Sequence, residues 1–252
     1  MRYKEGLREG EVVIYNPNGK LAQKGVFLND TLTGNLAVYY PDGDIKSQTA
    51  FESGKPQGWV ISYYPAGTIK DSIQYHEGKQ NGISKTFYED GVLQTEANYK
   101  NGMLDGFFKT FHPNGQLDTE SYHQQGIKNS TFKSFNDQGQ ILFEGNYTKG
   151  KLEGPNKAWY DNGQLKHQFT YKEGFKVGKG IVYFENGDIK EETNYADSEK
   201  TRTTKTYHKG KKLASEISFR DGKPFGVWKF YNPEGKLVTE EPYESGKLHG
   251  TQ

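Results

Sequence analysis

Residues 102–125 have the sequence GMLDGFFKTFHPNGQLDTESYHQQ, and this 24-residue stretch is one copy of a pattern that fills the chain. Its Gly106 belongs to a series of glycines separated by 24 residues or a multiple of 24, from which only Ser130 and Arg202 depart. The members of the series are Gly10, Gly34, Gly58, Gly82, Gly106, Gly154, Gly178, Gly226 and Gly250. A constant period over a whole chain indicates a tandem repeat, here of about ten and a half copies.

Other positions keep the same period. Gly102 and Gly115 each belong to a further glycine series. An aromatic residue lies four positions before the series of Gly115 in every copy but one, where Gly210 is displaced by one residue. These aromatic residues are Tyr15, Tyr39, Tyr63, Phe87, Phe111, Phe135, Trp159, Tyr183, Tyr207 and Tyr231. Each copy therefore holds two short apolar runs between glycine turns. Runs this short, bounded by Asn-Gly, Asp-Gly or Pro-x-Gly, predict strands and hairpins rather than helices.

We therefore predict an all-β fold, an elongated array of about ten tandem 24-residue β-hairpin repeats that form one long twisted antiparallel sheet. Residues 1–252 are expected to be a single repeat domain, on the order of 100 Å long because each copy adds two strands. The copy near residues 197–212 is degenerate, since Ser198 and Arg202 replace both repeat glycines. Because these residues adopt positive φ less readily than glycine, we expect a bulge, a kink or greater mobility there.

The composition excludes several classes of protein. Lys and Arg number 33 against 32 Asp and Glu, a net charge of +1, which argues against binding to nucleic acid or to an anionic membrane. The absence of cysteine excludes disulfides and thiolate metal sites. The first residues lack the apolar stretch of a signal peptide. We expect a cytoplasmic protein, or a periplasmic or surface protein if a signal peptide has been removed.

The pattern Gly-Lys-x-x-Gly, then Tyr-Tyr-x-x-Gly-x-Leu, then Glu-x-x-Tyr-x-x-Gly-Lys resembles the MORN repeat in its bacterial variant form. Residues 54–67 and 102–117 are good instances, and the resemblance covers essentially the whole chain. It extends to the bacterial YwqK family of antitoxin-like proteins and to exported proteins with 24-residue repeats. The resemblance implies tandem hairpins with roles in protein interaction, scaffolding and sometimes lipid contact, and it implies no catalytic motif.

No constellation of residues predicts catalysis. The six histidines form no HxxxH or HxH pair, and the two that share a column, His112 and His208, lie four copies apart. The glycines are turn residues rather than a phosphate loop before a helix. Neighbouring acidic residues such as Glu191 and Glu192 point to opposite faces of a strand. We expect no enzyme activity, no metal site and no cofactor.

The residue after each column aromatic gives the candidate binding strip. Spaced about 10 Å apart by the two strands of each copy, these side chains would form a flat amphipathic surface for a protein or for sugar rings. The predicted members are Tyr40, Tyr64, Tyr88, His112 and Tyr160. The alternative is that they pack between repeats and cap the sheet. Trp59, Trp159 and Trp228 share no column, which predicts local packing for each.

Two classes of function remain open. The first is a non-enzymatic repeat scaffold that binds a protein partner, a toxin if the antitoxin resemblance holds. The second is a cell-surface or wall protein that binds glycan. Terminal strands without a visible cap would also allow edge-to-edge pairing with a second copy or with the partner.

Overall fold

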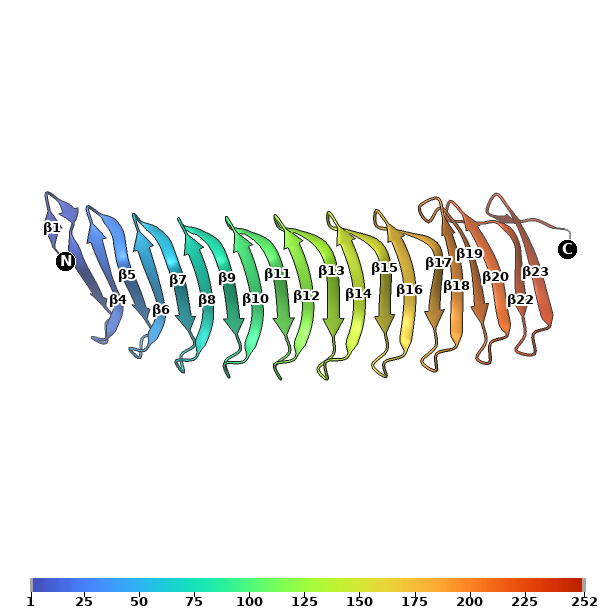
Figure 1. The fold of residues 1–252 in the computed structure, drawn as a ribbon, viewed down its shortest axis with the longest axis horizontal. Coiled ribbons are helices and arrows are strands. Elements are labelled where there is room, and N and C mark those ends of the chain that lie inside the picture. The colour runs from blue at the N-terminus through green and yellow to red at the C-terminus, as the bar shows by residue number, and fades with distance from the viewer. Residues whose placement is uncertain (1, 251–252) are drawn as a thin grey trace. The chain divides into compact units, whose positions relative to one another are not determined.

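The computed structural model describes residues 2–250, whose regular secondary structure consists of β-strands joined by turns (Figure 1). Contacts between Cα atoms group the residues into two units, one ending at Ile127 and the other beginning at Lys128, and each is described by itself. No helix in this part of the chain is long and apolar enough to cross a membrane. The prediction of an all-β fold made of hairpin repeats is confirmed.

In the first unit the paired strands are antiparallel and are neighbours in the chain. β1 and β2 form a small separate sheet, and a larger sheet starts at β3. The strands are β1 (Tyr3–Lys4), β2 (Leu7–Arg8), β3 (Gly10–Tyr15), β4 (Leu21–Leu28), β5 (Thr31–Tyr39), β6 (Ile45–Glu52), β7 (Lys55–Tyr63), β8 (Ile69–His76), β9 (Lys79–Phe87), β10 (Leu93–Lys100), β11 (Met103–Phe111) and β12 (Leu117–Gln124). This order follows directly from a chain of hairpins.

The second unit repeats the same arrangement. β13 (Ile127–Phe135) begins at the division between the units, and β20 pairs with both β21 and β22. The other strands are β14 (Ile141–Thr148), β15 (Lys151–Trp159), β16 (Leu165–Lys172), β17 (Phe175–Tyr183), β18 (Ile189–Ala196), β19 (Thr201–Tyr207), β20 (Leu213–Arg220), β21 (Lys223–Pro224), β22 (Gly226–Tyr231), β23 (Leu237–Glu244) and β24 (Lys247–Leu248).

The turn between copies is a two-residue hairpin turn. In the turn from β10 to β11, Asn101 and Gly102 both have positive φ, 53° and 84°, as a type I′ turn requires. The amide of Gly102 donates to the carbonyl of Gln80, and the amide of Asn101 donates to Oδ1 of Asn81. Each such turn is thereby held against the first residues of the strand that follows the preceding turn.

A bulge follows each of these ordinary turns. In the β10–β11 hairpin, Asn98 alone faces residues 105–107 between two regular pairs. Gly106 lies in the middle of that segment with φ 123°, and a Cβ built on it would lie 2.9 Å from Cβ of Asn98. The repeat glycine is therefore needed both for its backbone conformation and for the close approach of β10.

The degenerate copy changes shape without a bulge. Ala196 pairs with Thr201, and the pairing of β18 with β19 continues in regular register from there. Residues 197–200 form a longer loop, in which Asp197–Glu199 all have positive φ. In ordinary copies the bulge takes up two extra residues. Here the two extra residues lie in the loop, because Arg202 occupies the position at which the bulge needs a glycine. The predicted change of the turn is confirmed, and of the three predicted alternatives the bulge is absent.

The core is a thin layer on one face of each sheet, called here the inner face. Large and small side chains alternate across its strands, as Phe108 does with Ser121 and Phe132 with Gly145. Among residues 2–250, the buried apolar side chains are Val12, Ala97 and Ala158 alone. Because side chains alternate between faces along a strand, the neighbours of these residues form the outer face.

Candidate functional site

The predicted binding strip of the first unit lies in the turns that join the two strands of each copy. Tyr40, Tyr64 and Tyr88 are half-buried, and each hydroxyl donates a hydrogen bond to a backbone carbonyl of the next copy. The acceptors are the carbonyls of Tyr63, Phe87 and Phe111, at 2.7, 2.9 and 2.9 Å. These contacts favour the alternative interpretation, in which the column joins successive repeats.

The remaining members of the strip behave in related ways. Tyr160 in the second unit donates to the carbonyl of Tyr183 at 2.8 Å. Nε2 of His112 lies 3.6 Å from a carboxylate oxygen of Asp118. The ammonium groups of lysines on the following strands lie over three of the tyrosine rings, 5.4 to 5.8 Å from their centroids. The use of this strip as a binding surface stays a prediction.

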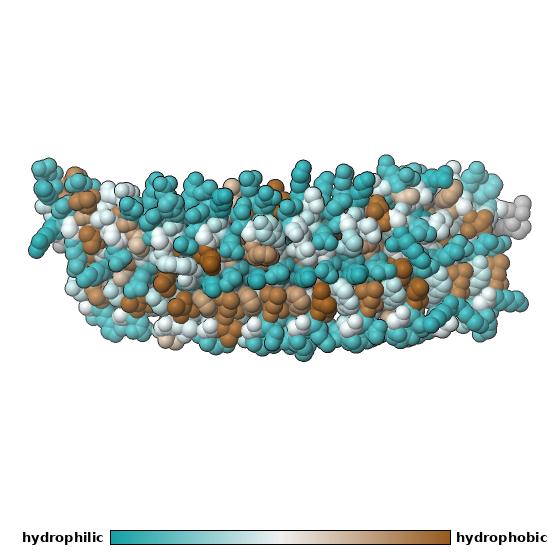
Figure 2. Space-filling view, viewed as in Figure 1, coloured by the Kyte–Doolittle hydropathy of each residue, from teal (hydrophilic) through white to brown (hydrophobic). Residues whose placement is uncertain are grey.

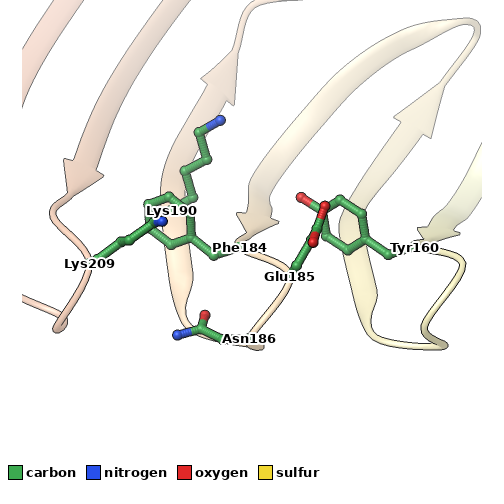
Figure 3. A pocket seen from close by; sticks show the side chains of 6 residues that line it. All are labelled: Tyr160, Phe184, Glu185, Asn186, Lys190 and Lys209. Atoms are coloured by element: carbon green, nitrogen blue, oxygen red, sulfur yellow. The ribbon is translucent and has the colours of Figure 1, made fainter.

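Phe184 lies in the same column and borders a hollow. Phe184 has no hydroxyl with which to reach the next copy, and a pocket of about 440 Å³ lies at this place (Figure 3). Tyr160, Phe184, Glu185, Asn186, Lys190 and Lys209 line it. The ammonium of Lys190 lies 5.9 Å from the centroid of the Phe184 ring. With two lysines and one glutamate, the pocket has a small positive excess of charge.

The outer face of the first unit carries a surface that the sequence analysis missed. Trp59, Ile83 and Phe107 occupy the same position in three successive copies and are 47%, 40% and 48% exposed. We call these three residues the apolar row. Figure 2 shows hydrophobic side chains gathered between hydrophilic ones on a face of the molecule. The prediction of local packing fits Trp228, whose ring lies against Phe219 and Tyr243, but it is wrong for Trp59.

Ion pairs lie beside the apolar row on the same face. Lys85 pairs with Glu96 at 3.0 Å and, one copy later, Lys109 pairs with Glu120 at 3.2 Å. At the equivalent positions of an earlier copy stand Ala37 and Gln48, opposite each other on β5 and β6. A short apolar side chain and a neutral amide therefore replace the ion pair.

A notch opens where this ion pair is missing. It has a volume of about 240 Å³ and lies next to Trp59. The side chains that we assign to this Trp59 notch are those of Asn35, Ala37, Gln48, Ala50, Trp59 and Ile61. None of them is charged. Oε1 of Gln48 accepts a hydrogen bond from the hydroxyl of Tyr63 at 3.3 Å, which orients the amide.

The second unit has a notch at the same positions, five copies further along the chain. Its volume is about 220 Å³, and its lining includes Lys157, Gln168 and Lys179. Lys179 occupies the position of Trp59 and pairs with Glu192 at 2.6 Å; the hydrogen bond from Lys179 holds the pKa of Glu192 below its usual value. Equivalent positions thus carry an uncharged notch in one unit and a charged notch in the other.

No arrangement for metal binding is found in residues 2–250, where no group of three or more His, Asp or Glu side chains could hold an ion. His167 has a pKa below its usual value because it is half-buried and because Lys166 and Lys176 lie nearby. Its ring lies 4.9 Å from that of Phe169, so it belongs to the packing of the second unit.

The apolar row could have been found from the sequence. Trp59, Ile83 and Phe107 each directly follow a glycine of the first series, and the Lys and Glu columns beside them are visible in the same alignment of copies. What the sequence did not show is that this column faces outward, because the first strand of copies such as 102–125 carries aromatic residues on both faces.

Comparisons with known proteins agree with this architecture. A family model described as "MORN repeat variant" matches residues 8–29, 80–101, 104–125, 152–173, 176–197 and 226–245. No curated protein matches the chain. Two solved structures with similarity are the crystal structure of TcdB2-TccC3 and that of TcdB2-TccC3-Cdc42, each 12% identical, with TM-scores of 0.18 and 0.17. The matches cover 93% of this chain but 17% and 18% of those chains, and likeness this weak carries no argument about function.

Proposed function

We propose a function from the family to which the chain belongs: it is a member of the MORN repeat variant family, whose model matches more than half of its residues. Repeats of this type are non-enzymatic and are generally associated with scaffolds for protein or membrane-lipid interaction. Our proposal is that this chain binds a protein partner, and that the apolar row of the first unit is the binding surface.

The exposure of the apolar row is the observation that carries this proposal. A Trp, an Ile and a Phe lie 40–48% exposed at one position of three successive copies, and few apolar side chains are buried among residues 2–250. Tryptophan and other aromatic residues are enriched at the centres of protein interfaces and contribute much of their binding energy. Covering the row would remove this surface from water, which is favourable in proportion to the apolar area buried.

The charge of the surface favours a protein over a lipid. The ion pairs Lys85–Glu96 and Lys109–Glu120 beside the row are neutral as pairs, and the chain has a net charge of only +1. An anionic membrane is attracted by clusters of basic residues near its surface. The row and its flanks do not form such a cluster.

The antitoxin-like role is a narrower form of the same proposal, in which the protein that covers the apolar row is a toxin. The wall-binding role is the second candidate. An exposed Trp could stack on a sugar ring, so the two roles need an experiment that separates them.

Site-specific photo-cross-linking tests the proposal. A benzoylphenylalanine residue at Ile83 should cross-link one defined protein in the cells that make the chain, and the same residue at Thr203 should not. Thr203 is the matched control, because it occupies the position of Ile83 in the second unit. The variants Ile83→Thr and Phe107→Thr copy the threonines that stand at this position in other copies, so they should fold.

In the cross-linking experiment, benzoylphenylalanine at Trp59 should give at least tenfold less cross-linked product in a chain that also carries Ile83→Thr and Phe107→Thr. Equal cross-linking from Ile83 and Thr203 would contradict the proposal. Co-sedimentation with peptidoglycan that is lost in the threonine variants would instead establish the wall-binding role.

A further inference from the structure

The apolar row has a spacing that selects the backbone of its partner. Trp59, Ile83 and Phe107 lie on β7, β9 and β11, with one strand between each two. Strands lie about 4.7–4.9 Å apart, so successive members of the row are about 9.6 Å apart across the sheet. A partner that contacts all three must present side chains on one side at this interval.

The regular conformations of a polypeptide differ in this interval. A polyproline II helix rises about 3.1 Å per residue with three residues per turn, so every third side chain returns to the same side after about 9.3 Å. An extended strand repeats after about 6.6 Å. In an α-helix the seventh residue returns after about 10.5 Å, and the misfit of about 0.9 Å per copy accumulates along the row. Polyproline II is the closest match.

The chemistry of the surface fits the same conformation. The side chains of the Trp59 notch are uncharged, which suits the apolar ring of proline. Gln74 lies directly opposite Trp59 on β8, and Asn98 lies opposite Ile83 on β10, so amide side chains alternate with the apolar row. A polyproline II segment makes no internal hydrogen bonds, and its carbonyl groups are therefore free to accept hydrogen bonds from such amides.

We propose that the partner presents an uncharged, proline-containing segment in the polyproline II conformation, which crosses the strands of the first unit along the apolar row and places one proline ring in the Trp59 notch. This inference rests on the proposed function and names the chemistry of the partner. Recognition of such segments on aromatic-lined surfaces is a general mode of peptide binding.

Titration calorimetry with a synthetic peptide tests the inference. The peptide is an uncharged 12-residue chain with proline at every third position, and it is titrated into the full chain. The decisive variant is Ala37→Lys with Gln48→Glu, which rebuilds in the Trp59 notch the ion pair that Lys85 and Glu96 form at the same positions. Because the fold already holds this pair in two later copies of the first unit, the variant should remain folded.

A matched control leaves the first unit unchanged. Gln168→Glu places a glutamate opposite Lys157 and so completes, in the equivalent notch of the second unit, the ion pair that other copies hold. We expect saturable binding of the peptide to the wild-type chain, at least tenfold weaker binding to the Ala37→Lys, Gln48→Glu variant, and unchanged binding to the Gln168→Glu variant.

Each other outcome overturns the inference. Absence of binding by the peptide, or equal binding by a peptide with proline at every fourth position, would show that the apolar row does not recognise a polyproline II segment. Binding of a neutral oligosaccharide that is abolished by Ala37→Lys with Gln48→Glu would assign the notch to a sugar ring. In the first two cases, cross-linking of a protein from Ile83 would still support the proposed function, so the two failures are distinguishable.

Discussion

Replacing Tyr64 by Phe removes one hydroxyl group and tests the contact between successive repeats. The hydroxyl donates to the carbonyl of Phe87 at 2.9 Å, from a half-buried position. A hydrogen bond of this kind contributes about 0.5–1.5 kcal/mol net, and the ring of Phe keeps the packing. We therefore expect the free energy of unfolding to fall by about 1 kcal/mol, and the melting temperature to fall by about 2–4 °C for a chain of this size.

The opposite change is available in the same column. Phe184→Tyr would place a hydroxyl where four other copies have one, within reach of the carbonyl of Tyr207, and should raise the free energy of unfolding by a similar amount. Equilibrium unfolding in urea, followed by circular dichroism, measures both variants; an unchanged m value would show that the unfolded state is unaffected. If Tyr64→Phe stays within about 0.3 kcal/mol of the wild type and Phe184→Tyr gains nothing, the hydroxyls do not join the repeats. The column would then be available to a ligand.

Three further changes test other parts of the structure. Gly180→Ala should destabilise the second unit by about 1–3 kcal/mol, because a Cβ at this position would lie 2.7 Å from Cε1 of Phe169 and 3.1 Å from Cε2 of Tyr195; thermal unfolding no lower than that of the wild type would show that the inner face has spare room. Gly106→Ala should cost more than Gly154→Ala in the same assay, because Gly106 has φ 123° and lies against Asn98, whereas Gly154 has φ 76° and open space around it. His167 binds protons less readily in the folded state than in the unfolded state, so its contribution to stability is complete above the unperturbed pKa of about 6.5 and is lost as the pH falls below it. His167→Gln should flatten the dependence of the unfolding free energy on pH between about pH 5 and 7, and an unchanged slope would assign that dependence to other groups.

The hairpins of this protein could be predicted from the sequence because their determinants are local. A type I′ turn needs two residues with positive φ, and Asn101-Gly102 meets that need within two positions of the chain. The 24-residue period then orders every strand after its neighbour. The loss of a glycine at Arg202 was equally visible, and it predicted an altered turn.

The direction of a side chain was harder to predict, because it depends on the neighbouring copy. The column of Tyr40, Tyr64 and Tyr88 was identified, yet only the fold showed that the hydroxyls reach carbonyl groups of the next repeat. In the degenerate copy, the two extra residues could lie either in the bulge or in the loop. The unbroken pairing of β18 with β19 shows that they lie in the loop.

The sequence by itself determined the repeat, the turns and the pairing of each strand with the next, since these follow from backbone conformations that glycine permits and other residues resist. Only the tertiary structure decided which apolar column is covered. Phe107 and Phe108 are adjacent in the chain, but Phe108 faces Ser121 on the inner face while Phe107 is left 48% exposed. Whether a side chain is buried depends on what lies opposite it on strands that the chain reaches later, and the Trp59 notch exists because Ala37 and Gln48 meet across such a pair.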